Sequence, residues 1–112
     1  MKSTVVRFYV HESAKLHGLL AYEWLLEKAK KMGIHGGSSF RAIAGFGRHG
    51  VLHEQHFFEL AGDLTIVTEF IVSAQDAEAL IDVIRNEKAH VVIAKWEVDL
   101  LLCDGGVCVV AS

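Results

Sequence analysis

The strongest constraint on this chain is the order in which two hydrophobic periodicities alternate along it. A period of two residues predicts a strand, and a period of about 3.6 residues predicts an amphipathic helix. Six such segments follow one another in the order strand, helix, strand, strand, helix, strand, at residues 4–10, 14–32, 40–46, 64–72, 73–88 and 91–102. The chain is therefore predicted to fold as a mixed α+β protein.

Local signals support the individual elements. In the first segment, Val6, Phe8 and Val10 alternate with residues of different character, as in a strand with two unlike faces. Gly33 supplies a stop for the first helix, and Ser73, with Asp76 three residues later, is predicted to cap the second. The order βαββαβ is typical of a ferredoxin-like fold, in which two helices cover one face of a four-stranded antiparallel sheet.

Length and composition limit the chain to one domain and exclude some classes of function. With 112 residues and 52% hydrophobic content, residues 1–112 are predicted to form a single domain with its own core. The net charge of −3, without a basic stripe, argues against a nucleic-acid partner. No apolar run approaches the roughly 20 residues that cross a bilayer, and the first residues lack a secretory signal. We therefore expect no membrane insertion and a cytoplasmic location.

The sheet face that the helices leave uncovered is predicted to be apolar. The strand phases place six apolar and four charged residues on it: Val5, Tyr9, Ile43, Val67, Ile71 and Ile93, with Arg7, Arg41, Glu69 and Lys95. Such a face is poorly suited to water, so we expect chains to associate through it. The alternative is that some strands are out of phase by one residue, which would move their side chains to the other face.

The stretch "RAIAGFGRHGVLH", residues 41–53, is the most unusual local sequence. Gly45 and Gly47 allow backbone N–H groups to approach an anion without obstruction by side chains, and Arg41 and Arg48 can neutralise phosphate oxygens. A nucleotide meets those requirements. The alternative is a tight exit from a strand with an exposed arginine, because a lone Gly-x-Gly pattern is weak evidence of a ligand site.

Longer stretches of the chain resemble a known family. In order and spacing, "VVRFYVHES", "KLHGLLAYEWLLEKAKKMGIHGGSSFRAIAGFG" and "LAGDLTIVTEFIVSAQDAEALI" resemble the PII-like proteins of domain of unknown function 190. The most specific pieces are His17-Gly18, the run from Arg41 to Gly47, and Asp63-Leu64, and the likeness extends from residue 5 to about residue 98. That family is similar in fold to PII signalling proteins and to divalent-cation-tolerance proteins, so the resemblance implies a homotrimer with the sheets turned inward.

PII-type proteins hold adenine nucleotides in clefts between protomers, at the base of the loop that joins strands two and three. The resemblance thus implies that Gly45, Phe46, Gly47, Arg48 and His49 border a site for AMP, ADP or ATP, and that the loop at about residues 45–58 reports occupancy. It also implies a regulated partner, commonly a membrane transporter. Two departures limit the transfer: this loop is shorter than the PII signalling loop, and a lysine- and glycine-rich phosphate turn after the second helix is absent.

The sequence is also compatible with two other functions, metal binding and catalysis. The chain has seven histidines, and His53 and His56 can place two imidazoles on one side of a helical turn, as in a metal-binding trimer resembling divalent-cation-tolerance proteins. No cysteine or carboxylate completes a divalent-metal set at a known spacing, and the histidines can instead hydrogen-bond within the loop. The third hypothesis is a small enzyme that uses the loop histidines. We expect no enzyme, because no nucleophile and base occur at a recognisable spacing.

The tail "LLLCDGGVCVVAS" contains both cysteines of the chain. If Gly105-Gly106 form a two-residue hairpin turn, Cys103 faces Cys108 in a non-hydrogen-bonded pair that can come close enough for a disulfide. The spacing resembles the redox-sensitive tail hairpin of certain PII-like proteins associated with bicarbonate transport, although the intervening residues differ. The alternative is that two reduced cysteines serve as small apolar residues of an extra strand.

Overall fold

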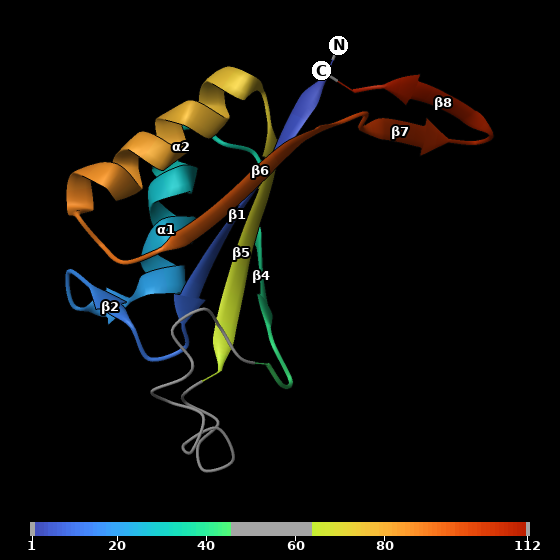
Figure 1. Cartoon of the computed structure of the whole chain (residues 1–112). Coiled ribbons are helices and arrows are strands. Elements are labelled where there is room, and N and C mark those ends of the chain that lie inside the picture. Colours follow the sequence, from blue (N-terminus) through green and yellow to red (C-terminus); the bar gives the residue numbers. More distant parts are fainter. Residues whose placement is uncertain (1, 46–63, 112) are drawn as a thin grey trace.

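The computed structural model describes residues 2–45 and 64–111 of the chain. Its main sheet has four antiparallel strands in the spatial order β4-β5-β1-β6, namely β1 (Ser3–His11), β4 (Ser38–Arg41), β5 (Thr65–Val72) and β6 (Val92–Val98). Helices α1 (Ala21–Lys31) and α2 (Ala74–Glu87) lie together on one face of this sheet (Figure 1). The predicted α+β, ferredoxin-like arrangement is confirmed.

Strand β1 runs through the centre of the fold because it pairs with β5 on one side and with β6 on the other. Its Val6 and Phe8 are fully buried and belong to one cluster with Leu25 of α1 and Leu80 of α2. Phe8 also meets Phe70 of β5 edge to face, with 6.1 Å between the ring centroids, a geometry that aromatic pairs favour. Burying each such side chain stabilises the folded chain by about 1.5–3 kcal/mol, which holds the helical layer on the sheet.

The first helix begins later than the sequence predicted. Residues before it form a small hairpin of two strands, β2 (Lys15–Leu16) and β3 (Leu19–Leu20). Its turn holds His17 at φ 51° and Gly18 at φ 82°, and positive φ at both central residues is what a type I′ hairpin turn requires. The expected helix from residue 14 was wrong because this turn outweighs the helical spacing of the leucines around it.

The second helix is as predicted. The Ser73 hydroxyl accepts a hydrogen bond from the backbone N–H of Asp76, at 3.1 Å, and so satisfies one of the free donors of the first turn. The helix ends at Lys88, which adopts a left-handed conformation with φ 56°. Among the residues described, neither helix is long and apolar enough to cross a membrane.

The face of the sheet away from the helices, here called the open face, differs in part from the prediction. It carries side chains from all four strands: Val5, Arg7, Tyr9, Phe40, Val67, Glu69, Ile71, Val92, Ala94 and Trp96. Placing Ile93, Lys95 and Arg41 on it was wrong, because their cross-strand partners point toward the helices. Phe8 lies opposite Ile93, and the core residue Ile66 lies opposite Arg41. Ile43 lies beyond the end of β4, which is shorter and earlier than the strand expected at residues 40–46.

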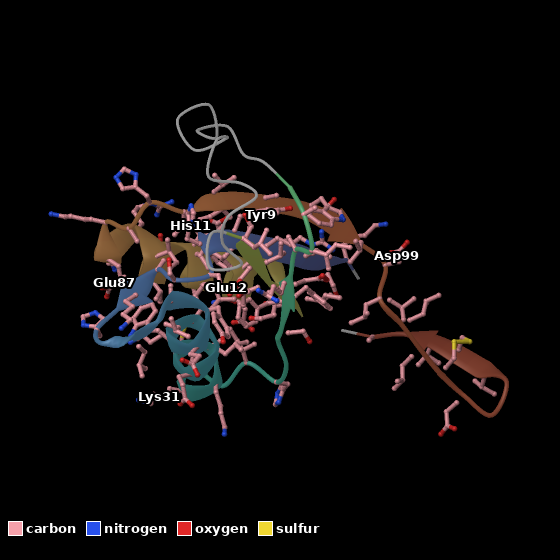
Figure 2. The ribbon with its side chains drawn as sticks, turned by 90° about the horizontal axis from the view of Figure 1, so that it is seen from below. Tyr9, His11, Glu12, Lys31, Glu87 and Asp99 are labelled. Carbon is pink, nitrogen blue, oxygen red and sulfur yellow. A yellow bond between two sulfur atoms is a disulfide. The ribbon has the colours of Figure 1, made fainter. Side chains whose placement is uncertain are left out.

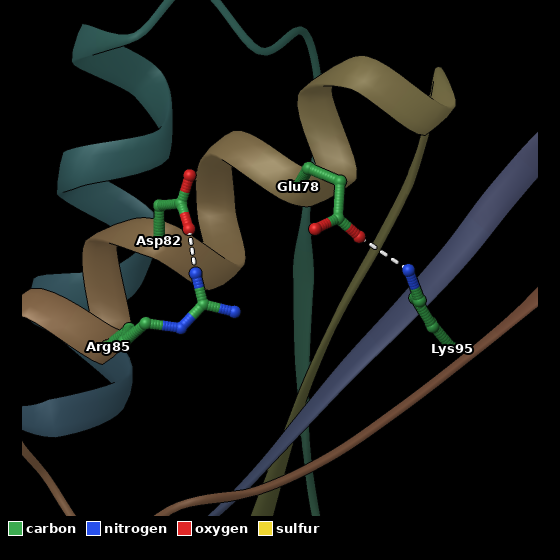
Figure 3. A network of polar contacts seen from close by, with 4 residues as sticks. All are labelled: Glu78, Asp82, Arg85 and Lys95. Atoms are coloured by element: carbon green, nitrogen blue, oxygen red, sulfur yellow. Dashed lines mark hydrogen bonds and ion pairs between the residues drawn. The ribbon is translucent and has the colours of Figure 1, made fainter.

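Lys95 therefore contacts a helix of its own chain. Its ammonium donates a hydrogen bond to the carboxylate of Glu78 on α2, near a second pair between Arg85 and Asp82 (Figure 3). The hydrogen bond from Lys95 and its positive charge lower the pKa of Glu78 below its usual value. Both pairs are exposed to solvent, so each contributes little to stability.

The last segment does not continue the sheet. The strand expected at residues 91–102 ends at Val98, and a separate hairpin follows, formed by β7 (Leu101–Asp104) and β8 (Val107–Val110). Gly105 and Gly106 make its two-residue turn with φ 60° and φ 89°. The expected extra C-terminal hairpin is thus present, and within the described residues its two strands pair with each other and with no other strand.

A glycine pair before β4 gives a matched test of how tightly this fold is packed. A Cβ added at Gly37 would lie 2.3 Å from Cε1 of the buried Phe70 ring, whereas one added at Gly36 would meet nothing within 4 Å. We expect Gly37→Ala to lower the free energy of unfolding by about 1–3 kcal/mol, because the ring or the strand must shift. Gly36→Ala is expected to change it by less than ~0.5 kcal/mol. Urea unfolding of both variants measures the difference, and equal stabilities would contradict the packing described.

Candidate functional site

The candidate site lies at the end of the sheet where β1 and β4 finish and β5 begins. The backbone N–H of Glu12 donates to the carbonyl of Leu64 at 2.8 Å, and the N–H of Ala42 donates to that of Thr65 at 2.9 Å. These bonds extend the antiparallel pairing beyond the strands and hold three chain segments together at one edge, here called the rim (residues 11–12, 41–45 and 64–65).

Arg41 of the predicted ligand set occupies this rim, but with a partner that the sequence did not indicate. Its Nε donates to Oε1 of Glu12 at 2.6 Å, and the Arg41 side chain remains about half exposed. The hydrogen bond and charge of Glu12 raise the pKa of Arg41 above its usual value. Figure 2 shows Glu12 next to His11 at the end of β1. Nothing in the local sequence marked Glu12, because its role follows from the pairing of strands far apart in the chain.

Of the remaining predicted ligand residues, the structure describes one, Gly45. Gly45 is exposed, follows Arg41 at the end of the described segment, and has no neighbour within 4 Å of an added Cβ. Phe46, Gly47, Arg48 and His49 lie outside the described residues, as do the predicted metal ligands His53 and His56. Within residues 2–45 and 64–111, no three His, Cys, Asp or Glu side chains gather as a metal site.

The open face has its own polar centre. Arg7 donates to Glu69 at 3.1 Å, and its guanidinium carbon lies 5.5 Å from the centroid of the Trp96 ring, within the range of a cation–π contact. Tyr9 contributes most to raising the pKa of Arg7 above its usual value, and Glu69 raises it further. The Nε atom of Arg7 is buried and has no hydrogen-bond partner in the described part of the chain.

Around that centre the open face is apolar and exposed. Phe40 is 54% exposed, Trp96 43% and Ile71 39%. On β6 the polarity runs opposite to that of a solvent-facing strand, because Trp96 points to the open side while Lys95 and Glu97 point to the helical side. Sequence reasoning missed Trp96, although its alternation with the two charged residues was a signal that the apolar side of this strand is the open one.

A second polar contact joins the small hairpin to the helices. His17 Nε2 lies 2.8 Å from a carboxylate oxygen of Glu87, at the end of α2, and the imidazole stacks on Trp24 with 5.6 Å between ring centroids. His17 therefore joins the turn of the small hairpin to both helices. Two shallow grooves of the described surface follow α1, and neither includes Arg41 or Gly45.

The tail hairpin joins its two cysteines. Cys103 lies directly opposite Cys108 in the register of β7 and β8, and Asp104 lies opposite Val107, as the two-residue turn predicts. The sulfur atoms are bonded as a disulfide, which Figure 2 shows on the hairpin, away from the sheet. The pair is far from the rim in sequence.

The chain is similar in sequence to a family of known proteins. The chain matches the family DUF190, described as "Uncharacterized ACR, COG1993", over residues 3–100. It is 30% identical over 87 residues to a UPF0166 protein of Aquifex aeolicus, a match that covers 78% of this chain and 83% of that protein.

Solved structures share the fold at lower identity. One is a protein of Thermus thermophilus described as PII-like and signalling, with 19% identity and a TM-score of 0.59 over 87% of this chain and 86% of that one. Another is CPII of Thiomonas intermedia, a nitrogen regulatory PII-like protein bound to ADP, AMP and bicarbonate, with 14% identity and a TM-score of 0.61 over 88% and 87%. The chain therefore belongs to the DUF190 family, and its fold is that of PII-like signalling proteins.

Proposed function

We propose that this protein is a PII-like regulator: a homotrimer that binds an adenine nucleotide at the rim and transmits occupancy through the segment at residues 45–58. The observation that carries the proposal is the position of Gly45, which lies at the end of the described segment, four residues after edge strand β4, in a fold shared with a protein bound to ADP and AMP. Phe46 and Gly47 follow Gly45 in the sequence. The protein that reads the signal would be a regulated partner such as a membrane transporter.

The open face supports the assembly. Exposed Phe40, Ile71 and Trp96 lie on three strands of this face, around the Arg7–Glu69 pair. Several large exposed apolar side chains on one face mark an interaction surface. Association through it would remove these side chains from water. The Arg7–Glu69 pair would then lie within or beside the interface, where it would favour one arrangement of the chains.

The rim supports an anionic ligand. Arg41 supplies a positive charge that Glu12 orients, and the proposed ligand residues Gly45, Phe46, Gly47, Arg48 and His49 follow it in sequence. Glycines at this point allow backbone N–H groups to reach phosphate oxygens. Because β4 contributes Phe40 to the open face and Arg41 to the rim, a ligand at the rim would lie close to the interface between chains. It would act as a switch only by binding one conformation more tightly than another.

The assembly is tested by placing a charge on the open face. We expect the wild-type protein to sediment as a trimer and Ile71→Glu to shift it to monomers, because a carboxylate buried between sheets would lack a partner. Met32→Glu is the control, since Met32 is 37% exposed, close to the 39% of Ile71, but lies at the end of α1. A wild-type monomer at micromolar concentration, or equal behaviour of both variants, would contradict the proposed interface.

The ligand is tested by calorimetry with AMP, ADP and ATP, and separately with zinc and copper. Binding heat from a nucleotide should be lost in Arg48→Ala and kept in Lys31→Ala, which removes a positive charge at the end of α1. Heat only from metals, lost on His53→Ala, would favour the metal-binding trimer instead. Conversion of a nucleotide to a product would favour the hypothesis of a small enzyme.

A redox role of Cys103 and Cys108 is a second candidate, favoured by the disulfide between them. Reduction would add two electrons and two protons to the S–S bond, while a dithiol reductant becomes its own disulfide. We expect the oxidised protein to bind no alkylating reagent and the reduced protein to bind it at both sulfurs, giving a mobility shift on a non-reducing gel. Cys103→Ser/Cys108→Ser should show no shift. If oxidised and reduced wild-type protein migrate alike, the redox role is ruled out.

A further inference from the structure

The tail hairpin, here called the arm (residues 101–110), carries apolar side chains on both of its faces. Cross-strand partners share a face, so Leu102, Val107 and Val109 lie on one side together with Asp104 near the turn, while Leu101, Val110 and the disulfide lie on the other. Every residue of β7 and β8 is exposed, with Leu102 at 65% and Val107 at 66%. An isolated two-stranded hairpin is only marginally stable in water, so this arm needs a surface to pack on.

The arm cannot find that surface on its own sheet. It leaves β6 after only Asp99 and Leu100, and its base is closed by a hydrogen bond from the N–H of Ala111 to the carbonyl of Leu100, at 2.7 Å. Asp99 is also paired with Lys2, at 3.0 Å. Figure 1 shows the arm directed past the end of the sheet near both termini, away from both helices and from β4 and β5.

We propose that the arm packs against a second copy of this chain, beside the interface formed by the open faces. The inference rests on the proposed trimer and adds a contact to it. Strand β6 carries exposed Val92 and Trp96 on the open face and continues into the arm, so the two apolar surfaces belong to one stretch of chain. When open faces meet, an arm that extends beyond its own sheet reaches toward the neighbouring chain.

The chemistry of the arm favours this occupant over others. Its ten residues include one charged side chain, Asp104, and no basic residue, so it offers no electrostatic attraction to an anionic membrane surface and little to a highly charged partner. The match to the family model ends at residue 100, directly before the arm begins. The disulfide would hold the hairpin in its docked shape before contact, which reduces the entropy lost on association.

The experiment compares two double variants of the full chain by sedimentation over a range of concentrations. Leu102→Thr/Val109→Thr makes one cross-strand pair of the arm polar while it keeps residues suited to a strand. Leu19→Thr/Met32→Thr is the control, since these residues are also exposed, at 44% and 37%, but lie on the helical side of the fold. Absence of free thiols in the arm variant shows that its hairpin and disulfide have formed.

We expect the arm variant to raise the concentration at which half of the assembly dissociates by at least roughly tenfold, and the control to stay within roughly twofold of wild type. In wild-type protein, amide hydrogens of residues 101–110 should exchange slowly in the assembly and rapidly after dilution to monomers. An unchanged midpoint in the arm variant, or rapid exchange of the arm within an intact assembly, would overturn the arm contact and leave the trimer standing. A wild-type monomer would overturn both.

Discussion

The pairing of β1 with both β5 and β6 is the constraint from which the rest of the structure follows. Because directly opposed residues share a face, this pairing decides which side chains reach the helices and which remain on the open face. It sends Val6 and Phe8 into the core and leaves Arg7 between Glu69 and Trp96. A register change of one residue in β6 would exchange Trp96 for Lys95 and make the contribution of β6 to the open face charged.

The sequence was sufficient for the order of the four main strands and two helices, the cap at Ser73 and the opposition of Cys103 and Cys108. Each of these depends on local spacing, which one chain carries in full. The faces of Lys95 and Arg41 were assigned wrongly because they depend on register with distant strands. Glu12 escaped notice for the same reason, since it approaches Arg41 only after β1 and β4 take their places in one sheet. The predicted helix start failed at the turn through His17, where two neighbouring residues with positive φ override a helical pattern.

The open face and the rim, the two surfaces proposed for assembly and for ligand binding, are built in part from the same strand. Neighbouring residues of β4 serve both, with Phe40 on the open face and Arg41 at the rim, so association of chains and binding of an anion would involve one edge strand. At the other edge of the sheet, β6 supplies Trp96 to the open face and leads into the arm. The sheet edges, rather than the helices, therefore carry the features that would differ between a lone chain and an assembly.

Glu12 holds an unusual place between the chain segments that flank residues 46–63. Its carboxylate accepts from Arg41 on the preceding side, and its backbone N–H donates to Leu64 on the following side. An anion that drew the guanidinium away would leave this carboxylate without its cation, at a residue whose own backbone is tied to the start of β5. Glu12 thus connects Arg41 to Leu64, so a displacement of the Arg41 side chain would alter the contacts of the residue that holds the start of β5.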